Sequence, residues 1–333
     1  MWHGGNVFQI ADRELEASVL GKLEQVEHLL REGVTSADPL ITEAAQHLIL
    51  AGGKRFRPLL TLLAGHLAEP GSPQLIRAAT VVELTHLATL YHDDVMDEAE
   101  VRRGAPSANA RWSNSVAILV GDYLFARAAD LAAELGIEAV RIQARTFARL
   151  VHGQIAETVG NRGADPISHY LEVLADKTAS LISTSARFGG MFSGADPAVV
   201  EALSRYGEMI GIAFQLSDDL LDIASDSEDS GKTPGTDLRR GVATLPVLYA
   251  QSDQDGDADS VRLRQLLSGG AITDEDELSE ALALLRESPA LKRARELVRW
   301  YAEQARAQLA PVPDSPARRA LASLCDVVVN RTS

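Results

Sequence analysis

Apolar residues recur at spacings of three and four along almost the whole chain, which is the spacing that places them on one face of a helix. One such stripe consists of Leu15, Val19, Leu23, Val26 and Leu30. No segment alternates apolar and polar residues between turn signals, so strands are not expected. The glycine- and proline-rich interruptions are short, and none has the composition of a flexible linker. The sequence therefore predicts an all-α protein, a single domain over residues 1–333 built from roughly a dozen helices.

Composition excludes several classes of protein. The 333 residues are 46% hydrophobic and carry a formal net charge of −15, which suffices for a large core and argues against a nucleic-acid partner. The single cysteine, Cys325, excludes an internal disulfide and suits a reducing compartment. The first ten residues lack the layout of a signal peptide, and no apolar run approaches the roughly 20 residues that cross a bilayer. We therefore expect a cytoplasmic protein.

Two copies of the pattern Asp-Asp-x-x-Asp interrupt the apolar stretches. The first copy is Asp93, Asp94 and Asp97, and the second is Asp218, Asp219 and Asp222. Helical geometry places the outer aspartates of each copy about 40° apart, so each copy presents its carboxylates on one face. Leucines precede the first copy, whereas solvated charge clusters usually have polar neighbours. Clustered carboxylates repel one another unless cations neutralise them, so the motifs predict a magnesium site for phosphorylated substrates, with two solvated helix faces as the alternative.

Basic residues elsewhere complete a site for a diphosphate. The run Gly52-Gly53-Lys54-Arg55-Phe56-Arg57-Pro58 places three cations after a glycine pair, and glycines let the backbone approach an anion closely. Arg102 and Arg103 follow the first aspartate motif. His86 lies seven residues before Asp93, about two turns back on the same helical face, where a binding role and a place in the apolar core are both open.

The polar stretch from Ser225 to Gly241 has no core face. It begins directly after the second aspartate motif and contains Lys232, Arg239 and Arg240. Long loops beside a site are disproportionately functional, so we expect a lid that carries phosphate-binding charges. The alternative is an ordinary solvent-exposed loop.

Two acidic motifs and several separate basic groups indicate two diphosphates, one bound through magnesium and one bound directly by arginine and lysine. The ionisation of an allylic diphosphate requires this arrangement, because the leaving pyrophosphate needs charge stabilisation. The carbocation that remains needs a dry apolar cavity in which the double bond of a second substrate attacks it.

At these residues the sequence resembles the trans-isoprenyl diphosphate synthase (polyprenyl synthetase) family. The matching stretches follow one another in the family's order over about residues 40–250: the run 52–58, His86 to Gly104, Gly121-Asp122, Lys177-Thr178, and Phe214 to Asp222. The resemblance implies an all-α bundle around a central apolar cavity, of the isoprenoid synthase class I type, and a homodimer. It also implies Mg²⁺ as the cofactor, with isopentenyl diphosphate and an allylic diphosphate as substrates.

Carried over position by position, the resemblance gives individual residues a role. It assigns three magnesium ions to Asp93, Asp94, Asp97, Asp218, Asp219 and Asp222. It assigns isopentenyl diphosphate to Lys54, Arg57, His86 and Arg103. It assigns the binding of the allylic diphosphate to Arg102, Lys177 and Lys232, and it implies that Thr178 and Gln215 face the developing carbocation.

Two further expectations depend on individual positions: the length of the product, and one place where the sequence departs from the family pattern. Ala88 and Thr89 lie one turn before Asp93, where short-chain members commonly have a bulky aromatic residue, so we expect a long product between heptaprenyl and decaprenyl. Tyr91 is rotated off that face. Val242 stands where the family commonly has a lysine, and Arg239 or Arg240 is the candidate substitute.

Three readings therefore remain in order of preference. The first is a long-chain trans-polyprenyl diphosphate synthase that contacts a membrane only transiently, when its apolar product leaves. The second is a short-chain farnesyl or geranylgeranyl diphosphate synthase. The third is a non-catalytic partner subunit of a heteromeric synthase, a reading that only Val242 favours.

Overall fold

The structure is a computed structural model that describes residues 10–224, 234–253 and 257–331, and these residues are almost entirely helical. Contacts within the chain divide it into two compact units. Unit 1 comprises Met1–Arg149, Leu181–Gly207 and Gln308–Ala322, and unit 2 comprises Leu150–Ser180, Glu208–Ala307 and Ser323–Ser333. The prediction of an all-α fold is confirmed, and the single domain stays a prediction.

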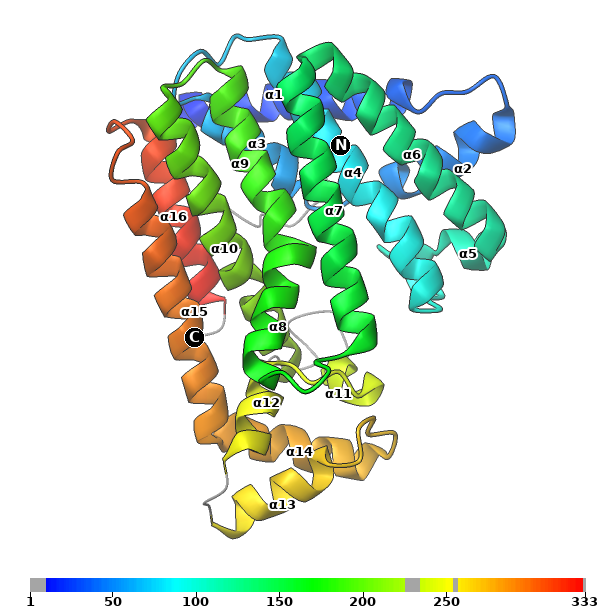
Figure 1. The fold of residues 1–333 in the computed structure, drawn as a ribbon, viewed down its shortest axis with the longest axis vertical. Helices are drawn as coiled ribbons and strands as arrows, with labels where there is room; N and C mark the ends of the chain where they lie inside the picture. Colours follow the sequence, from blue (N-terminus) through cyan, green and yellow to red (C-terminus); the bar gives the residue numbers. More distant parts are fainter. Residues whose placement is uncertain (1–9, 225–233, 254–256, 332–333) are drawn as a thin grey trace. The chain divides into compact units, whose positions relative to one another are not determined.

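Unit 1 contains the N-terminal helices, which Figure 1 labels, and a short hairpin. In chain order these are α1 (Arg13–Gly33), α2 (Pro39–Leu50), α3 (Phe56–Gly65), α4 (Gln74–Met96), β1 (Val101–Arg102), β2 (Ala105–Pro106), α5 (Ala108–Arg111), α6 (Asn114–Leu135) and the first part of α7 (Ile137–Val159). Aspartate caps start several of them. The Asp38 carboxylate, for example, accepts the Leu40 N–H at 2.8 Å, one residue after a proline that suits the first helical position.

Helix α4, which carries the first aspartate motif, is buried on nearly every side because it packs against α1, α3 and α6. Leu84, Leu87 and Ala88 are fully buried. A helix that is apolar on nearly all sides is expected to lie inside a protein, as the range Gln74–Met96 does. Asp97 is the residue that ends it.

The prediction of no strands is wrong at one place. Strands β1 and β2 form a two-residue antiparallel ladder in which Val101 pairs with Pro106 and Arg102 pairs with Ala105. The turn between them consists of Arg103 and Gly104, with φ of 54° and 75°. A two-residue turn with positive φ at both positions matches the right-handed twist of a hairpin, and a ladder this short leaves no alternating pattern in the sequence.

Unit 2 contains most of the C-terminal half of the chain. Its elements include α8 (Pro166–Leu174), a π-helical turn η1 (Ala175–Ala179), α11 (Thr236–Arg240), α12 (Leu245–Ser252), α13 (Ala258–Leu267), α14 (Glu275–Glu287) and α15 (Pro289–Gln308). Three further helices complete the chain: α9 (Ser180–Phe192), α10 (Pro197–Ala224) and α16 (Pro316–Asn330). The second aspartate motif lies near the C-terminal end of α10.

Two expectations from composition can be compared with the structure. Cys325 is a free, buried thiol in α16. Across the described residues, the search for a helix both long and apolar enough to cross a membrane finds none.

Candidate active site

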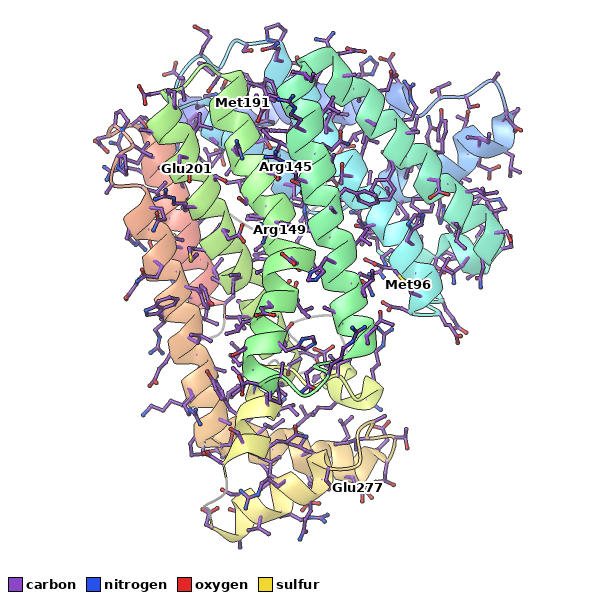
Figure 2. All side chains as sticks on the ribbon, in the orientation of Figure 1. Met96, Arg145, Arg149, Met191, Glu201 and Glu277 are labelled. Carbon is purple, nitrogen blue, oxygen red and sulfur yellow. The ribbon has the colours of Figure 1, made fainter. Side chains whose placement is uncertain are left out.

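The first aspartate motif places its three carboxylates in different environments at the end of α4. Asp94 is fully buried, Asp93 is half-buried, and Asp97 is exposed beside Met96, which Figure 2 labels. The Asp94 Oδ1 atom accepts a hydrogen bond from Arg102 Nε at 2.6 Å, whereas its Oδ2 atom is buried without a hydrogen-bond partner. Burial raises the pKa of Asp94, and the neighbouring Arg102 guanidinium opposes that rise. A buried carboxylate oxygen with unused lone pairs fits a bound cation.

The hairpin holds two adjacent arginines that contact different partners, Arg102 at the end of β1 and Arg103 in the turn. Arg102 contacts Asp94, whereas Arg103 donates to the carbonyl oxygens of Leu48, at 2.9 Å, and Gly52. Gly53 makes room for the Arg103 guanidinium, because a Cβ atom at Gly53 would lie 2.7 Å from the Arg103 Cζ atom. Of the glycine pair after α2, Gly53 is therefore the one that leaves space for the Arg103 guanidinium.

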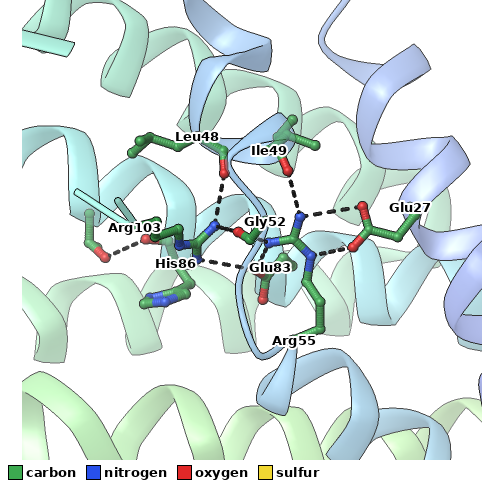
Figure 3. A network of polar contacts seen from close by, with 9 residues as sticks. Glu27, Leu48, Ile49, Gly52, Arg55, Glu83, His86 and Arg103 are labelled. Carbon is green, nitrogen blue, oxygen red and sulfur yellow. Dashed lines mark hydrogen bonds and ion pairs between the residues drawn. The ribbon is translucent and has the colours of Figure 1, made fainter. Parts of the chain in front are cut away.

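Arg103 belongs to a buried cluster of cations around Glu83 (Figure 3). Arg55 donates to Glu83 Oε1 at 3.0 Å and also forms an ion pair with Glu27, while Arg103 Nη2 lies 3.8 Å from Glu83 Oε1. Arg55 further donates to the carbonyl oxygens of Ile49 and Gly52. Burial lowers the pKa of Arg55, but the two glutamates more than reverse that effect. Arg55 is thus a structural cation that fixes the glycine turn.

Arg57 and His86 differ from Arg55 because, within residues 10–224, 234–253 and 257–331, no carboxylate forms an ion pair with either of them. The Arg57 Nε atom is buried without a hydrogen-bond partner, and burial lowers the Arg57 pKa to about 10, so the side chain stays charged at neutral pH. Burial and the surrounding arginines hold the pKa of His86 well below its ordinary value, so its ring is neutral. Arg55, Arg57 and Arg103 face two glutamates, Glu27 and Glu83, in this cluster, which leaves an excess of positive charge. Lys54 is exposed at its edge.

The second aspartate motif is held differently, since each carboxylate has its own partner in unit 2. Arg331 forms an ion pair with Asp218 at 2.5 Å. Asp219 accepts from Gln215 Nε2 at 3.0 Å and from the Tyr170 hydroxyl. Burial raises the pKa of Asp219 to about 7, although both hydrogen bonds act to lower it.

Asp222 shapes the chain segment that follows α10. Its two carboxylate oxygens accept the backbone N–H groups of Thr236 and Asp237, at 3.2 and 3.0 Å, and so cap the start of α11. In the expected lid, Lys232 lies outside the described residues. Arg239 is paired with Glu275, whereas Arg240 and Val242 are exposed.

The π-helical turn η1 contains the predicted Lys177 and Thr178. Lys177 forms an ion pair with Glu157 of α7, and Thr178 Oγ1 donates to Gln215 Oε1 at 3.3 Å. A Cβ atom at Gly153 would lie 2.6 Å from the Lys177 nitrogen, so the close approach of α7 and η1 requires that glycine. Single π-helical turns inside α-helices occur frequently at functional sites.

The residues predicted to set product length lie on α4. Ala88 is fully buried, and Thr89 is half-buried with its hydroxyl bonded to the His86 carbonyl oxygen at 2.7 Å. The Tyr91 hydroxyl donates to the Ala44 carbonyl oxygen and accepts the Leu48 N–H, so Tyr91 faces α2. This orientation agrees with the expectation that Tyr91 points away from the motif's face.

Comparison with known proteins decides the family. The polyprenyl synthetase family profile matches residues 38–285. The chain belongs to the polyprenyl synthetase family. It is 56% identical over 264 residues to a nonaprenyl diphosphate synthase of Mycobacterium tuberculosis, a match that covers 79% of this chain and 78% of that protein. The predicted family and enzyme class are thereby confirmed.

Solved structures of polyprenyl synthetases agree with the fold. A geranylgeranyl pyrophosphate synthase from Corynebacterium glutamicum, crystallised with calcium and isoprenyl diphosphate, is 44% identical and superimposes with a TM-score of 0.88 over 97% of this chain and 99% of that one. A decaprenyl diphosphate synthase from Rhodobacter capsulatus is 38% identical, with a TM-score of 0.86 over 96% and 99% of the two chains.

Within this polyprenyl synthetase, the structure gathers the predicted residues in two groups. Arg57, His86, Arg103 and the Asp94–Arg102 pair belong to unit 1. The Thr178–Gln215–Asp219 chain of hydrogen bonds belongs to unit 2. Across the part of the chain that is described, no three His, Cys, Asp or Glu side chains are grouped so that they hold a metal ion.

Four residues that contact these groups were missed from the sequence: Glu83, Glu157, Tyr170 and Arg331. Glu83 left a signal, since a carboxylate between Val82 and Leu84 in an apolar helix needs a buried cation as partner. The other three lie on ordinary amphipathic or terminal segments. Their partners are distant in sequence, so only the fold reveals them.

Proposed function

We propose that this chain condenses isopentenyl diphosphate with an allylic diphosphate, repeatedly and in the trans configuration, to give a polyprenyl diphosphate of heptaprenyl to decaprenyl length. The observation that carries this proposal is the buried cation cluster in which Arg57 and His86 have no carboxylate of their own. Such groups are prepared for an anion from outside the chain. The identity to a nonaprenyl diphosphate synthase supports the long product.

In this proposal the cluster binds the diphosphate of isopentenyl diphosphate. Arg57 and Arg103 supply charge, Lys54 reaches the substrate from the exposed edge, and neutral His86 supplies a hydrogen bond without adding charge. Arg55 keeps the turn in place and does not itself bind substrate, because two glutamates already surround it. The negative charges of the substrate offset the excess of arginines.

The aspartates of both motifs would hold Mg²⁺, three ions in all with substrate bound. The unpartnered Asp94 Oδ2 atom and the desolvated Asp219 carboxylate fit this role, since a cation relieves the cost of burying either charge. When bound, Mg²⁺ stabilises the negative charge of the departing diphosphate. The calcium in the Corynebacterium glutamicum structure supports the use of a divalent metal.

The chain's own residues prepare the allylic substrate for ionisation. Arg102, Lys177 and Lys232 bind its diphosphate in this proposal, with Arg240 as the exposed substitute for the lysine that Val242 replaces. Before substrate binds, Asp94 and Glu157 neutralise Arg102 and Lys177. Thr178 and Gln215 present oxygen dipoles to the developing carbocation, and the released pyrophosphate takes the final proton.

The proposal includes a homodimer formed through α7. This helix exposes apolar side chains at spacings of three and four along its whole length: Ile137, Val140, Ala144, Ala148, Val151, Ile155 and Val159. A continuous exposed apolar stripe on a helix indicates a protein interface. Analytical ultracentrifugation at micromolar concentration tests this, and a monomer would contradict it.

We propose a cytoplasmic location with membrane contact only at product release, because the product is far more apolar than the substrates.

The experiment that decides the proposed activity combines purified protein, Mg²⁺, labelled isopentenyl diphosphate and farnesyl or geranylgeranyl diphosphate. We expect labelled products of heptaprenyl to decaprenyl length. Products no longer than geranylgeranyl diphosphate would support the short-chain alternative, and failure to elongate any allylic primer would overturn the proposal.

A further inference from the structure

Tyr170, four residues before the end of α8, connects three parts of unit 2 through one hydroxyl group. This hydroxyl donates to Asp219 Oδ2 on α10, and it faces the backbone N–H of Leu245, the first residue of α12. Helices α8 and α12 pack against each other, which brings the two residues together. The chemistry proposed above gives Tyr170 no role.

The start of α12 needs an acceptor from outside the helix. The first N–H groups of any helix lack partners within it, and Thr244, which precedes α12, makes no side-chain cap. Pro246 has no N–H, so the free donors of this first turn are the N–H groups of Leu245 and Val247. A tyrosine hydroxyl is both a donor and an acceptor, which lets Tyr170 accept from Leu245 while it donates to Asp219.

The Asp219 carboxylate is consequently fixed by both of its oxygens. Gln215 donates to Oδ1 and Tyr170 to Oδ2, while Thr178 in turn donates to Gln215. A carboxylate offers about four lone-pair directions, of which these two hydrogen bonds use about two. The remaining directions are therefore held in a fixed orientation and stay available to a cation.

We propose that Tyr170 is a positioning residue that sets the orientation in which Asp219 binds a divalent cation and ties that orientation to the first turn of α12. This inference rests on the proposed function, since it takes Asp219 to be a metal ligand. Hydrogen bonds to metal-binding carboxylates commonly orient the ligand in this way. Cation binding and the order of the first turn of α12 are then coupled through one hydroxyl.

The test uses Tyr170→Phe in the full-length protein, with Tyr206→Phe as the matched control. Tyr206 is fully buried in unit 1, and its hydroxyl donates to the Leu321 carbonyl oxygen at 2.7 Å, so the control also removes one buried hydroxyl. Calorimetric titration with Mg²⁺ in the presence of inorganic pyrophosphate should give roughly 10- to 100-fold weaker binding for Tyr170→Phe and unchanged binding for the control. In steady-state assays of Tyr170→Phe, the Mg²⁺ concentration that gives the half-maximal rate should rise by a similar factor, while kcat at saturating Mg²⁺ changes little.

Amide exchange provides a second measurement, made on the wild-type protein and on Tyr170→Phe. Mg²⁺ with pyrophosphate should slow exchange in residues 245–249 of the wild type, and this slowing should disappear in Tyr170→Phe. The role of Tyr170 is overturned if Tyr170→Phe binds the metal as tightly as the wild type or more tightly. It is also overturned if the exchange rates of residues 245–249 in the wild type are the same with and without the metal. A wild-type protein that binds no divalent cation contradicts the proposed function instead.

Discussion

The two aspartate motifs have the same sequence pattern, but the structure surrounds them with different chemistry. In the first motif a single arginine neutralises Asp94 and leaves one buried oxygen unpartnered. In the second motif Asp219 is held by the neutral donors Gln215 and Tyr170. The first arrangement relies on a charge that an incoming phosphate can compete for, and the second on hydrogen bonds that can persist when a cation binds. Equal motifs therefore need not respond equally to mutation, pH or metal.

Removal of one carboxylate from each motif should have the largest effect. Asp94→Asn and Asp219→Asn should each lower kcat/KM for the allylic substrate on the order of 10²- to 10³-fold, because each removes charge that the proposed cations need. Steady-state assays with saturating isopentenyl diphosphate measure this. Asp130→Asn, on the exposed side of α6, is the control. If one of the two variants kept nearly full activity, its motif would not hold the metal.

Neighbouring arginines in unit 1 should separate binding from stability. Arg57→Met should raise KM for isopentenyl diphosphate roughly 10- to 100-fold with little change in stability, because Arg57 lacks a carboxylate partner. Arg55→Met should lower the free energy of unfolding by about 3 kcal/mol, because it removes the cation paired with Glu27 and the nearer of the two cations paired with Glu83. Urea unfolding and steady-state kinetics of both variants provide the measurement, and an exchange of the two phenotypes would refute the distinction.

The pKa of Asp219 predicts that the stability of the protein depends on pH. Its folded pKa of about 7 lies above the ordinary value of 3.8, so the folded state holds a proton that the unfolded state has released. The stability that this proton contributes is fully present below about pH 3.8 and is lost as the pH rises through 7. Without metal, wild-type stability relative to Asp219→Asn should fall between pH 5 and 7, by at most about 1.4 kcal/mol per pH unit. The difference between wild type and Tyr206→Phe should stay constant, and a constant difference for Asp219→Asn would contradict the assignment.

Substitution beside the first motif should change product length and leave the chemistry intact. In the series Ala88→Val and Ala88→Phe, the mean product should shorten as the side chain grows, because the added volume blocks the path of the elongating chain. Chromatography of dephosphorylated products measures the length, and thermal melting checks that the buried position tolerates the change. Products of unchanged length from a folded Ala88→Phe variant would refute the placement of the path beside α4.

The smallest effect is expected at the exposed Val242. Val242→Lys restores the cation that the family commonly has, and it should lower KM for the allylic diphosphate about two- to fivefold, as a single exposed charge contributes little. Arg240→Ala should raise the same KM if Arg240 is the substitute. No change in either variant would exclude this segment from the site.

Helix content, the family and both motif-bearing helices were predictable because they depend on local periodicity and on residues adjacent in sequence. The Asp94–Arg102 pair was within reach for the same reason, since eight residues separate the partners. Glu83 was overlooked, although its apolar neighbours in the sequence indicated a buried charge. The partners of Asp218 and Asp219 could not be found, because Arg331 lies 113 residues and Tyr170 lies 49 residues away, and no periodic pattern encodes such pairings. The hairpin was missed because two-residue strands have no period.

The Arg103–Gly104 turn also limits how this region can evolve. Because Arg102 of β1 supplies a guanidinium to Asp94 and Arg103 of the turn supplies another to the carbonyls of Leu48 and Gly52, the length of the segment between α4 and β2 is fixed from both sides. A single inserted residue between Asp97 and Arg102 would shift the register of the hairpin and detach both arginines at once. Insertions and deletions in this segment should therefore abolish activity. A random library of insertions and deletions screened for activity should contain no active variant with a change in residues 97–106.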